Sequence, residues 1–208
     1  MSVPNLVDMP DTCAATITMT LNSVVGENKS PFTFQSQFYD WGGQQWIADI
    51  TFPPFNSRQK AAEWQSFGLQ LRGKFGVFLM GDPLGKNPMG TALGNPVVDG
   101  SGQTGNILQT TGWTPNQIGA LKKGDYIQYG SGINARLHFV LNDVNADASG
   151  NANINIAPQI RYSPLNGQQI IVNDPKGAFK LTENSWSWSA SPGPLYRIRF
   201  SAMEYVSQ

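Results

Sequence analysis

Short stretches of alternating apolar and polar residues, separated by Gly, Pro, Asn and Asp, constrain this 208-residue chain more than any other feature. Successive side chains of a β-strand point to opposite faces, so the alternation predicts half-buried strands. Many short runs at this spacing are typical of an all-β sandwich or barrel. We expect strands at residues 16–21, 32–39, 45–52, 74–80, 107–110, 125–129, 136–141, 152–156, 169–172, 178–181, 186–189 and 196–205.

One segment has a helical period instead. Its apolar positions are spaced by three and four residues: Ala61, Trp64, Phe67 and Leu71. This spacing predicts one amphipathic helix over residues 57–71, and Gly73 just beyond it is the expected stop signal. Asn56 can cap the helix, with Gln59 in the place of the glutamate of a capping box. We expect the apolar face to plug or cover a barrel.

A Gly-rich segment is the second landmark. Residues 81–105 contain seven glycines and three prolines, and Val97-Val98 is their one aliphatic run. A loop of that length is uncommon in a compact domain and is usually functional or in contact with a partner. Because we find no repeat and no shift in composition, we expect a single β-rich domain over residues 1–208 with an extended arm or loop at about 81–106.

The chain is poor in charge. Charged residues make up 13% of it, against a usual share of about 25%. Fourteen basic residues balance fourteen acidic ones, and 17 Asn and 15 Gln supply much of the polarity. A near-zero net charge favours association, and amides pair well in interfaces. An amide-rich monomer surface is the equally open alternative.

Several functional classes have no support in the sequence. The basic residues are scattered, which argues against sequence-specific nucleic-acid binding, and no stretch of 18 apolar residues predicts a membrane span. The N-terminus lacks the charged start and apolar centre of a signal peptide, and Cys13 has no second cysteine for an internal disulfide. We therefore expect synthesis in a reducing cytoplasm, with later release inside a larger particle still open.

The sequence Gly100-Ser101-Gly102-Gln103-Thr104-Gly105 matches a dinucleotide-binding pattern. That pattern works through a helix N-terminus that receives the pyrophosphate. The residues that follow, 106–115, have the pattern of a strand and a turn. We therefore expect a loop and no cofactor.

Oxygen-bearing side chains alternate at Asp143, Asn145 and Asp147, as at the start of a calcium loop. The sixth position is Ala148 rather than Gly, and the twelfth is Ile154 rather than Glu. These three residues are weak metal candidates, and a polar hairpin loop is the simpler interpretation. We expect no other metal site.

His138 is the single histidine, and it lies inside an expected strand. The sequence identifies no nucleophile that would act with this histidine in a catalytic triad. A zinc site would need further ligands, and Cys13 is the single thiol. We therefore expect no catalytic residues and no enzyme activity. The open alternative is an enzyme that uses a pair of carboxylates from strands far apart in the sequence, as glycosidases do.

Trp186 and Trp188 lie two residues apart in a serine-rich strand, so they would share one face. Two tryptophans on a flat strand can stack on sugar rings, as in a carbohydrate-binding module. The alternative is that both face the core and the serines face solvent.

Two motifs carry a resemblance to a known family: Leu121-x-x-Gly124-Asp125-x-Ile127 and Asp147-x-x-Gly150-x-Ala152-x-Ile154-x-Ile156-x-Pro158-x-Ile160-Arg161. With the order of landmarks from Trp46 to Arg161, the chain resembles small bacteriophage tail-tip structural proteins of the distal-tail or baseplate-hub kind. The resemblance implies a β-barrel homo-oligomer in the virion, typically a hexameric ring, that links the tail tube to the tail-tip or hub proteins of the baseplate. The family has no catalytic residues. A tail-tube, terminator or head-decoration protein and a carbohydrate-binding β-sandwich are the alternatives.

Overall fold

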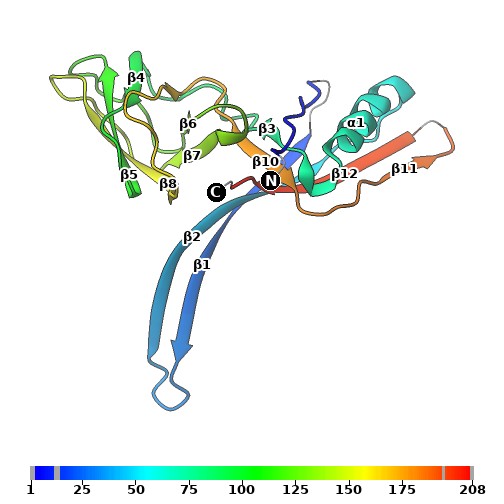
Figure 1. Ribbon diagram of the computed structural model, residues 1–208, viewed down its shortest axis with the longest axis horizontal. Coiled ribbons are helices and arrows are strands. Elements are labelled where there is room, and N and C mark those ends of the chain that lie inside the picture. The colour runs from blue at the N-terminus through cyan, green and yellow to red at the C-terminus, as the bar shows by residue number, and fades with distance from the viewer. Residues whose placement is uncertain (1–2, 12–14, 194, 207–208) are drawn as a thin grey trace.

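The computed structural model of the chain describes residues 3–11, 15–193 and 195–206, and Cys13 lies outside them. The protein is mostly β, with 46% strand and 10% helix, as the alternation predicts. Two antiparallel six-stranded sheets lie side by side, and a long hairpin extends away from both (Figure 1). One sheet is open and carries the helix, and the other is rolled into a barrel.

The open sheet is built on the predicted alternation. Ala48 and Ile50 are buried on one of its faces, and Ile198 and Ala202 of a neighbouring strand are buried with them. Ala48 lies directly opposite Ala202 in the register. The strands follow in the spatial order β1 (Thr16–Lys29), β2 (Ser36–Thr51), β12 (Leu195–Glu204), β10 (Gly177–Leu181) and β3 (Phe78–Met80), and β11 (Trp188–Ser191) pairs with β12.

Helix α1 (Arg58–Leu71) covers the buried face of the open sheet. Its buried positions include all four predicted ones: Ala61, Trp64, Phe67 and Leu71. The Trp64 ring lies 4.2 Å from the ring of Phe52, centroid to centroid, at the end of β2. The helix therefore covers the open sheet, and the expectation that it covers a barrel is wrong.

The start of α1 also differs from the prediction. The N-cap residue is Ser57 rather than Asn56, and it makes no side-chain capping hydrogen bond. At the other end, Arg72 and Gly73 both have positive φ angles, 53° and 70°. The helix thus ends where the sequence predicts: Arg72 is its left-handed C-cap residue, and Gly73 adopts the same conformation without a steric cost.

The second sheet closes almost completely into a barrel. Its first and last strands meet through a bridge between Val97 and Gln169, and Val98 N–H donates to the Gln168 carbonyl at 2.9 Å. Aliphatic side chains such as Leu108 and Ile154 fill the interior and have no solvent exposure. The strand order is β4 (Gly94–Val98), β5 (Gly105–Trp113), β8 (Ala152–Ile160), β7 (Arg136–Val140), β6 (Tyr126–Tyr129) and β9 (Ile170–Ile171).

Residues 81–105 do not form the extended Gly-rich arm that we expected. Strand β4 occupies part of this segment and pairs with β5. The stretch before β4 lies against the barrel, where Met89 N–H and Gly90 N–H donate to the Asp125 carboxylate at 2.7 and 3.2 Å. Backbone groups that are satisfied in this way bind the segment to the body of the protein.

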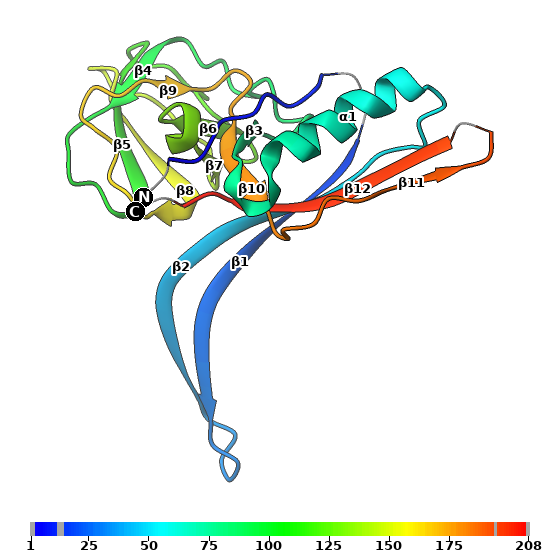
Figure 2. The same ribbon diagram turned by 45° about the vertical axis from the view of Figure 1, so that its right-hand side comes forward.

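The extended part of the molecule lies elsewhere in the chain. Strands β1 and β2 pair from Thr16 and Thr51 outward to Lys29 and Ser36, far beyond the edge of β12. The predicted strand at residues 32–39 is wrong in its first half, because residues 30–35 form the turn of this hairpin. Figure 2 shows the hairpin curving away from the open sheet and the barrel.

Candidate assembly surface

The outer part of the β1–β2 hairpin, residues 24–43, is called the projecting hairpin here. Its two strands pair with each other, and no other described strand pairs with them. Seven large apolar side chains on this hairpin are exposed, and Phe32 at the tip is 91% exposed. These side chains are Val24, Val25, Phe32, Phe34, Phe38, Tyr39 and Trp41.

The aromatic side chains occupy both faces of the projecting hairpin. Phe38 lies opposite Glu27 in the register, whereas the next residue, Tyr39, lies opposite Gly26. Trp41 reaches the Gly26 side as well, because a Cβ added to Gly26 would lie 3.4 Å from Trp41 Nε1 and 3.7 Å from Tyr39 Cβ. Neither face is therefore the polar face that a half-buried strand presents to water.

The base of the projecting hairpin is bound to the barrel. Gln159 at the end of β8 uses its backbone N–H to donate to Gln44 Oε1 at 2.8 Å, and its side-chain amide donates to the Gly42 carbonyl. Arg161 donates to the Gln44 carbonyl. Since Gly42 of the hairpin and the adjacent Gln44 are both bonded to residues at the end of β8, the fold sets the direction in which the hairpin projects.

An isolated two-stranded hairpin is marginally stable in water, and exposed apolar patches on a protein usually mark an interaction site. The projecting hairpin is a two-stranded hairpin without further strands beside it among the described residues, and it exposes seven large apolar side chains. Aromatic residues such as tryptophan, tyrosine and phenylalanine are also enriched in protein–protein interfaces. The arrangement is chemically suited to contact with another macromolecule.

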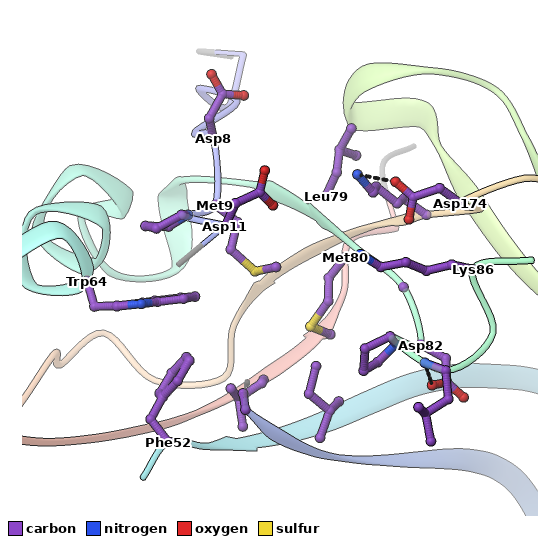
Figure 3. A pocket seen from close by; sticks show the side chains of 18 of the residues that line it. Asp8, Met9, Asp11, Phe52, Trp64, Leu79, Met80, Asp82, Lys86 and Asp174 are labelled. Carbon is purple, nitrogen blue, oxygen red and sulfur yellow. Dashed lines mark hydrogen bonds and ion pairs between the residues drawn. The ribbon is translucent and has the colours of Figure 1, made fainter. Parts of the chain in front are cut away.

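A cavity of about 780 Å³ lies on the other side of the molecule, between the N-terminal segment, α1 and the open sheet. Its floor is apolar: Phe52 and Trp64 extend into the same space as Met9 and Met80 (Figure 3). Six charged side chains complete the lining, and the four aspartates among them outnumber the two lysines: Asp8, Asp11, Asp82, Lys86, Asp174 and Lys176. The cavity is therefore apolar inside and acidic at its edge.

Charged groups are buried where the barrel meets the open sheet. Glu204 at the end of β12 has no solvent exposure and forms an ion pair with Arg161. Arg136 donates to the Tyr205 carbonyl at 2.9 Å and is also buried. Burial lowers the pKa of Arg136, while the nearby Glu204 carboxylate raises it. These contacts bind the two sheets together.

His138 belongs to the same junction. Its Nδ1 donates to the Pro158 carbonyl at 2.7 Å, and its ring stacks on Tyr129 at 4.9 Å between centroids. Burial lowers the pKa of His138 to about 3, and burial likewise raises the pKa of Tyr129 to about 12. Both side chains are neutral at pH 7, and His138 serves as a packed side chain of the barrel wall.

The three weak metal candidates each bond to a different part of the protein. Asp143 pairs with Lys122 at 2.9 Å, and Asn145 Oδ1 accepts from Gly119 N–H at 2.7 Å. Asp147 Oδ1 accepts two backbone N–H groups of its own loop at 2.8 Å each. In the described residues, no group of three or more His, Cys, Asp or Glu side chains is placed to hold a metal ion.

The segment with the dinucleotide-like pattern forms a loop, and strand β5 follows it directly. Gln103 holds this loop together, because its Nε2 donates to the Asp99 carbonyl at 2.7 Å and its Oε1 accepts from Gln109 N–H at 2.7 Å. The strand prediction for the residues after Gly105 is thus confirmed. The glycines serve a turn, since Gly100, Gly102 and Gly105 all have positive φ angles.

The structure separates the two tryptophans of the carbohydrate hypothesis. Trp186 packs against Phe67 and Phe200, with ring centroids 6.2 and 5.0 Å away. Trp188 lies in β11 and is 41% exposed. Since Trp186 packs against the core beside α1 and Trp188 is exposed, the two rings do not form one exposed stacking platform.

Sequence reasoning missed the projecting hairpin, although one signal was present. Phe38, Tyr39 and Trp41 place three aromatic residues within four positions, which fills both faces of a strand. A strand with one buried face needs apolar residues at every second position only. The cavity had no comparable signal, since its walls come from segments far apart in the sequence.

Comparisons with known proteins add no family. The sequence matches no protein-family model and no curated protein. Within the described part of the chain, no helix has the length and apolarity needed to cross a membrane.

Proposed function

We propose that this protein is a non-catalytic structural subunit of a bacteriophage virion, which assembles head to tail into a ring at the distal end of the tail. The ring would be a hexamer that links the tail tube to the tail-tip or hub proteins. The sequence resemblance over Trp46 to Arg161 supports the position in the tail. The role is mechanical and involves contacts between subunits without turnover.

One observation carries this proposal: the projecting hairpin is fixed in direction and exposes seven large apolar side chains. A ring needs a heterologous contact, in which one surface of a subunit meets a different surface of its neighbour. A rigid extension on one side of the body serves as one half of such a contact. In an isolated subunit the same extension exposes apolar area with no gain in stability.

Low charge supports the same interpretation. With a net charge of zero and 13% charged residues, copies of the chain repel one another weakly. The outer face of β1 adds Thr16, Thr18 and Thr20, all exposed and uncharged. A subunit with neutral faces can approach its neighbours closely, because few charges must be desolvated.

The test compares the whole chain with a variant that lacks the projecting hairpin. Ser23 and Gln44 are paired directly in the register. Replacing residues 24–43 by Asn-Gly joins these two residues through a two-residue turn that suits a β-hairpin. Light scattering coupled to size exclusion should give a mass near six times the 22.7 kDa chain for the wild type and a monomer for the variant.

The variant must keep its fold for the comparison to count, which circular dichroism and a cooperative thermal transition would show. Ring-shaped particles in negative stain would support the wild-type result. A wild-type chain that stays monomeric up to millimolar concentration would contradict the proposal. A hairpin-less variant that forms the same oligomer would contradict the role of the hairpin.

A further inference from the structure

The tip of the projecting hairpin has a fixed shape. Ser30 N–H donates to the Gln35 carbonyl at 2.9 Å, and Phe34 N–H donates to the Ser30 carbonyl at 3.0 Å. Phe32 and Phe34 are 91% and 71% exposed on this turn. A side chain that is held in place before binding loses less entropy on binding. The backbone of the tip is therefore ordered before binding, and it carries two exposed phenyl groups.

Lysine supplies the single charge at the tip. Lys29 is the one charged residue between positions 28 and 36, and its Nζ lies 5.4 Å from the centre of the Phe34 ring. The tip is thus an apolar surface with one positive charge beside it. A matching surface would be an apolar recess with an acidic edge.

The cavity between the N-terminal segment, α1 and the open sheet has these properties. Its volume of about 780 Å³ lies within the range of about 300–1,000 Å³ that binding pockets show. Phe52, Trp64 and Met80 form an apolar floor, and four aspartates against two lysines give its lining a formal charge of −2. The recess complements the tip in both polarity and charge.

A hairpin cannot reach the cavity of its own chain. In both views the projecting hairpin extends from one side of the open sheet, while the N-terminal segment and α1 lie on the other side (Figures 1 and 2). The bonds from Gln159 to Gly42 and from Arg161 to the adjacent Gln44 hold the hairpin in that direction. A second copy of the chain is therefore the occupant that the geometry allows.

A lipid bilayer fits the hairpin less well than a protein partner does. Both edges of the projecting hairpin are unpaired among the described strands. Backbone N–H and C=O groups without partners are costly in hydrocarbon, which is why open sheet edges do not occur there. A protein surface can satisfy such groups.

We propose that Phe32 and Phe34 of one copy seat in the cavity of the next copy, with Lys29 facing the aspartates at its edge. This inference rests on the proposed function and names the two surfaces of the ring contact. Each copy then carries one tip and one recess, so the contact repeats from subunit to subunit and a closed ring leaves neither unused.

The experiment separates the two halves of the contact. Phe32→Ala/Phe34→Ala removes the tip, and Leu79→Trp adds a bulky ring to the part-buried wall of the cavity. Each variant alone should be monomeric in analytical ultracentrifugation, with self-association weakened at least about 100-fold, as for the loss of two central aromatic anchors. An equimolar mixture should form a dimer and stop there, because it contains one intact tip and one intact recess per pair.

A matched control removes apolar side chains elsewhere. Ile118 and Leu165 are 83% and 73% exposed and lie outside both the hairpin and the cavity lining. The Ile118→Ala/Leu165→Ala variant should assemble like the wild type. A photoreactive benzoylphenylalanine at position 32, in a mixture of isotopically light and heavy chains, should cross-link between chains to peptides that line the cavity.

The outcomes distinguish this inference from the proposed function. If the wild type assembles but the tip variant assembles equally well, or if the cross-links fall outside the cavity, the inference is overturned and the proposed function stands. If the wild type remains monomeric, both are overturned. Flotation with phosphatidylethanolamine–phosphatidylglycerol vesicles that depends on Phe32 and Phe34, with assembly unchanged, would instead assign the tip to lipid.

Discussion

Arg161, which follows β8 of the barrel, forms an ion pair with Glu204, which ends β12 of the open sheet and is fully buried. Glu204 also accepts a hydrogen bond from Trp46 N–H at 3.3 Å. A single carboxylate thus contacts β2 of the open sheet and the end of a barrel strand. The same Arg161 donates to the Gln44 carbonyl at the base of the projecting hairpin.

We expect Glu204→Gln to destabilise the protein strongly. The change leaves Arg161 mostly buried without its negative partner, and breaking a buried pair in this way costs on the order of 3 kcal/mol. Urea unfolding measures the loss. Lys122→Gln, which breaks an exposed pair with Asp143, is the control and should leave the midpoint nearly unchanged. Equal effects of the two variants would contradict the structural role of Glu204.

We expect His138 to make the protein less stable in mild acid. Its pKa is about 3 when folded and near 6.5 when unfolded, so the folded state excludes a proton that the unfolded state binds. Above pH 6.5 the histidine is neutral in both states and does not change the free energy of unfolding. Below that value the free energy of unfolding falls by about 1.4 kcal/mol per pH unit, down to about pH 3.

Carboxylates also titrate in part of this range, so the comparison needs a variant without the imidazole. His138→Phe keeps a ring against Tyr129, although it loses the bond to the Pro158 carbonyl and lowers stability at every pH. Urea midpoints between pH 7 and pH 5 should fall less steeply for this variant than for the wild type. If the urea midpoints of the two proteins fell equally steeply with pH, protonation of His138 would not be the cause of the lost stability.

The sequence predicted those parts of the fold in which one face is buried. Trp46, Ala48 and Ile50 alternate because the open sheet has α1 on one side only, and α1 itself was found from the spacing of its apolar face. The projecting hairpin breaks the alternation because neither of its faces is buried in the chain. Gly42-Gly43 resembles a turn, yet it lies within β2 opposite Val24, where the register shifts.

The candidate sites were harder to predict for a related reason. Asp125 belongs to a sequence motif, but the three backbone N–H groups that donate to it lie in two segments of the chain. The cavity likewise is lined by the N-terminal segment, α1 and β3, which only tertiary packing brings together. The loop and strand at the Gly-rich pattern could be predicted locally, since they depend on the residues that come next.

We expect Gly68→Ala to destabilise the protein, although alanine is the better helix former. A Cβ at position 68 would lie 1.8 Å from Trp186 Cε2, so the indole must move. Overpacking of this kind costs about 1–3 kcal/mol, against a gain of about 1 kcal/mol in helix propensity.

The sign of the Gly68→Ala effect should reverse when the obstacle is removed. In a Trp186→Ala background, the same substitution has room for its methyl group and should raise the melting temperature relative to that background. Thermal denaturation of the four proteins gives the coupling between the two positions. Additive effects would mean that Trp186 does not occupy the space above Gly68.

We expect calcium to leave the melting temperature unchanged. The oxygens of Asp143, Asn145 and Asp147 already accept hydrogen bonds from different partners. Backbone N–H groups of Asn151 and Ser149 lower the pKa of the Asp147 carboxyl, so this charge is already stabilised by its own loop. A ligand that binds the folded state raises its stability, so equal melting curves in calcium and in EDTA would support this view. A calcium-dependent rise that Asp147→Asn abolishes would contradict it.

We expect Asp125→Asn to release the stretch before β4 from the barrel. Asp125 is buried, and its carboxylate accepts from the N–H groups of Met89, Gly90 and Lys122 at 2.7, 3.2 and 2.7 Å. An asparagine has one acceptor oxygen, so its NH₂ group must face at least one of these donors. A buried donor without a partner costs about 1–3 kcal/mol.

Hydrogen exchange followed by mass spectrometry locates this effect. Peptides that contain Met89 and Gly90 should exchange faster in Asp125→Asn than in the wild type, because their amides lose a stable acceptor. Asp147→Asn is the matched control: it also removes a carboxylate that accepts backbone N–H groups, but in an exposed loop, so faster exchange should stay within residues 147–151. Unchanged exchange at Met89 and Gly90 would mean that Asp125 does not hold the Gly-rich segment, and that other contacts keep it from becoming the extended arm its composition predicts.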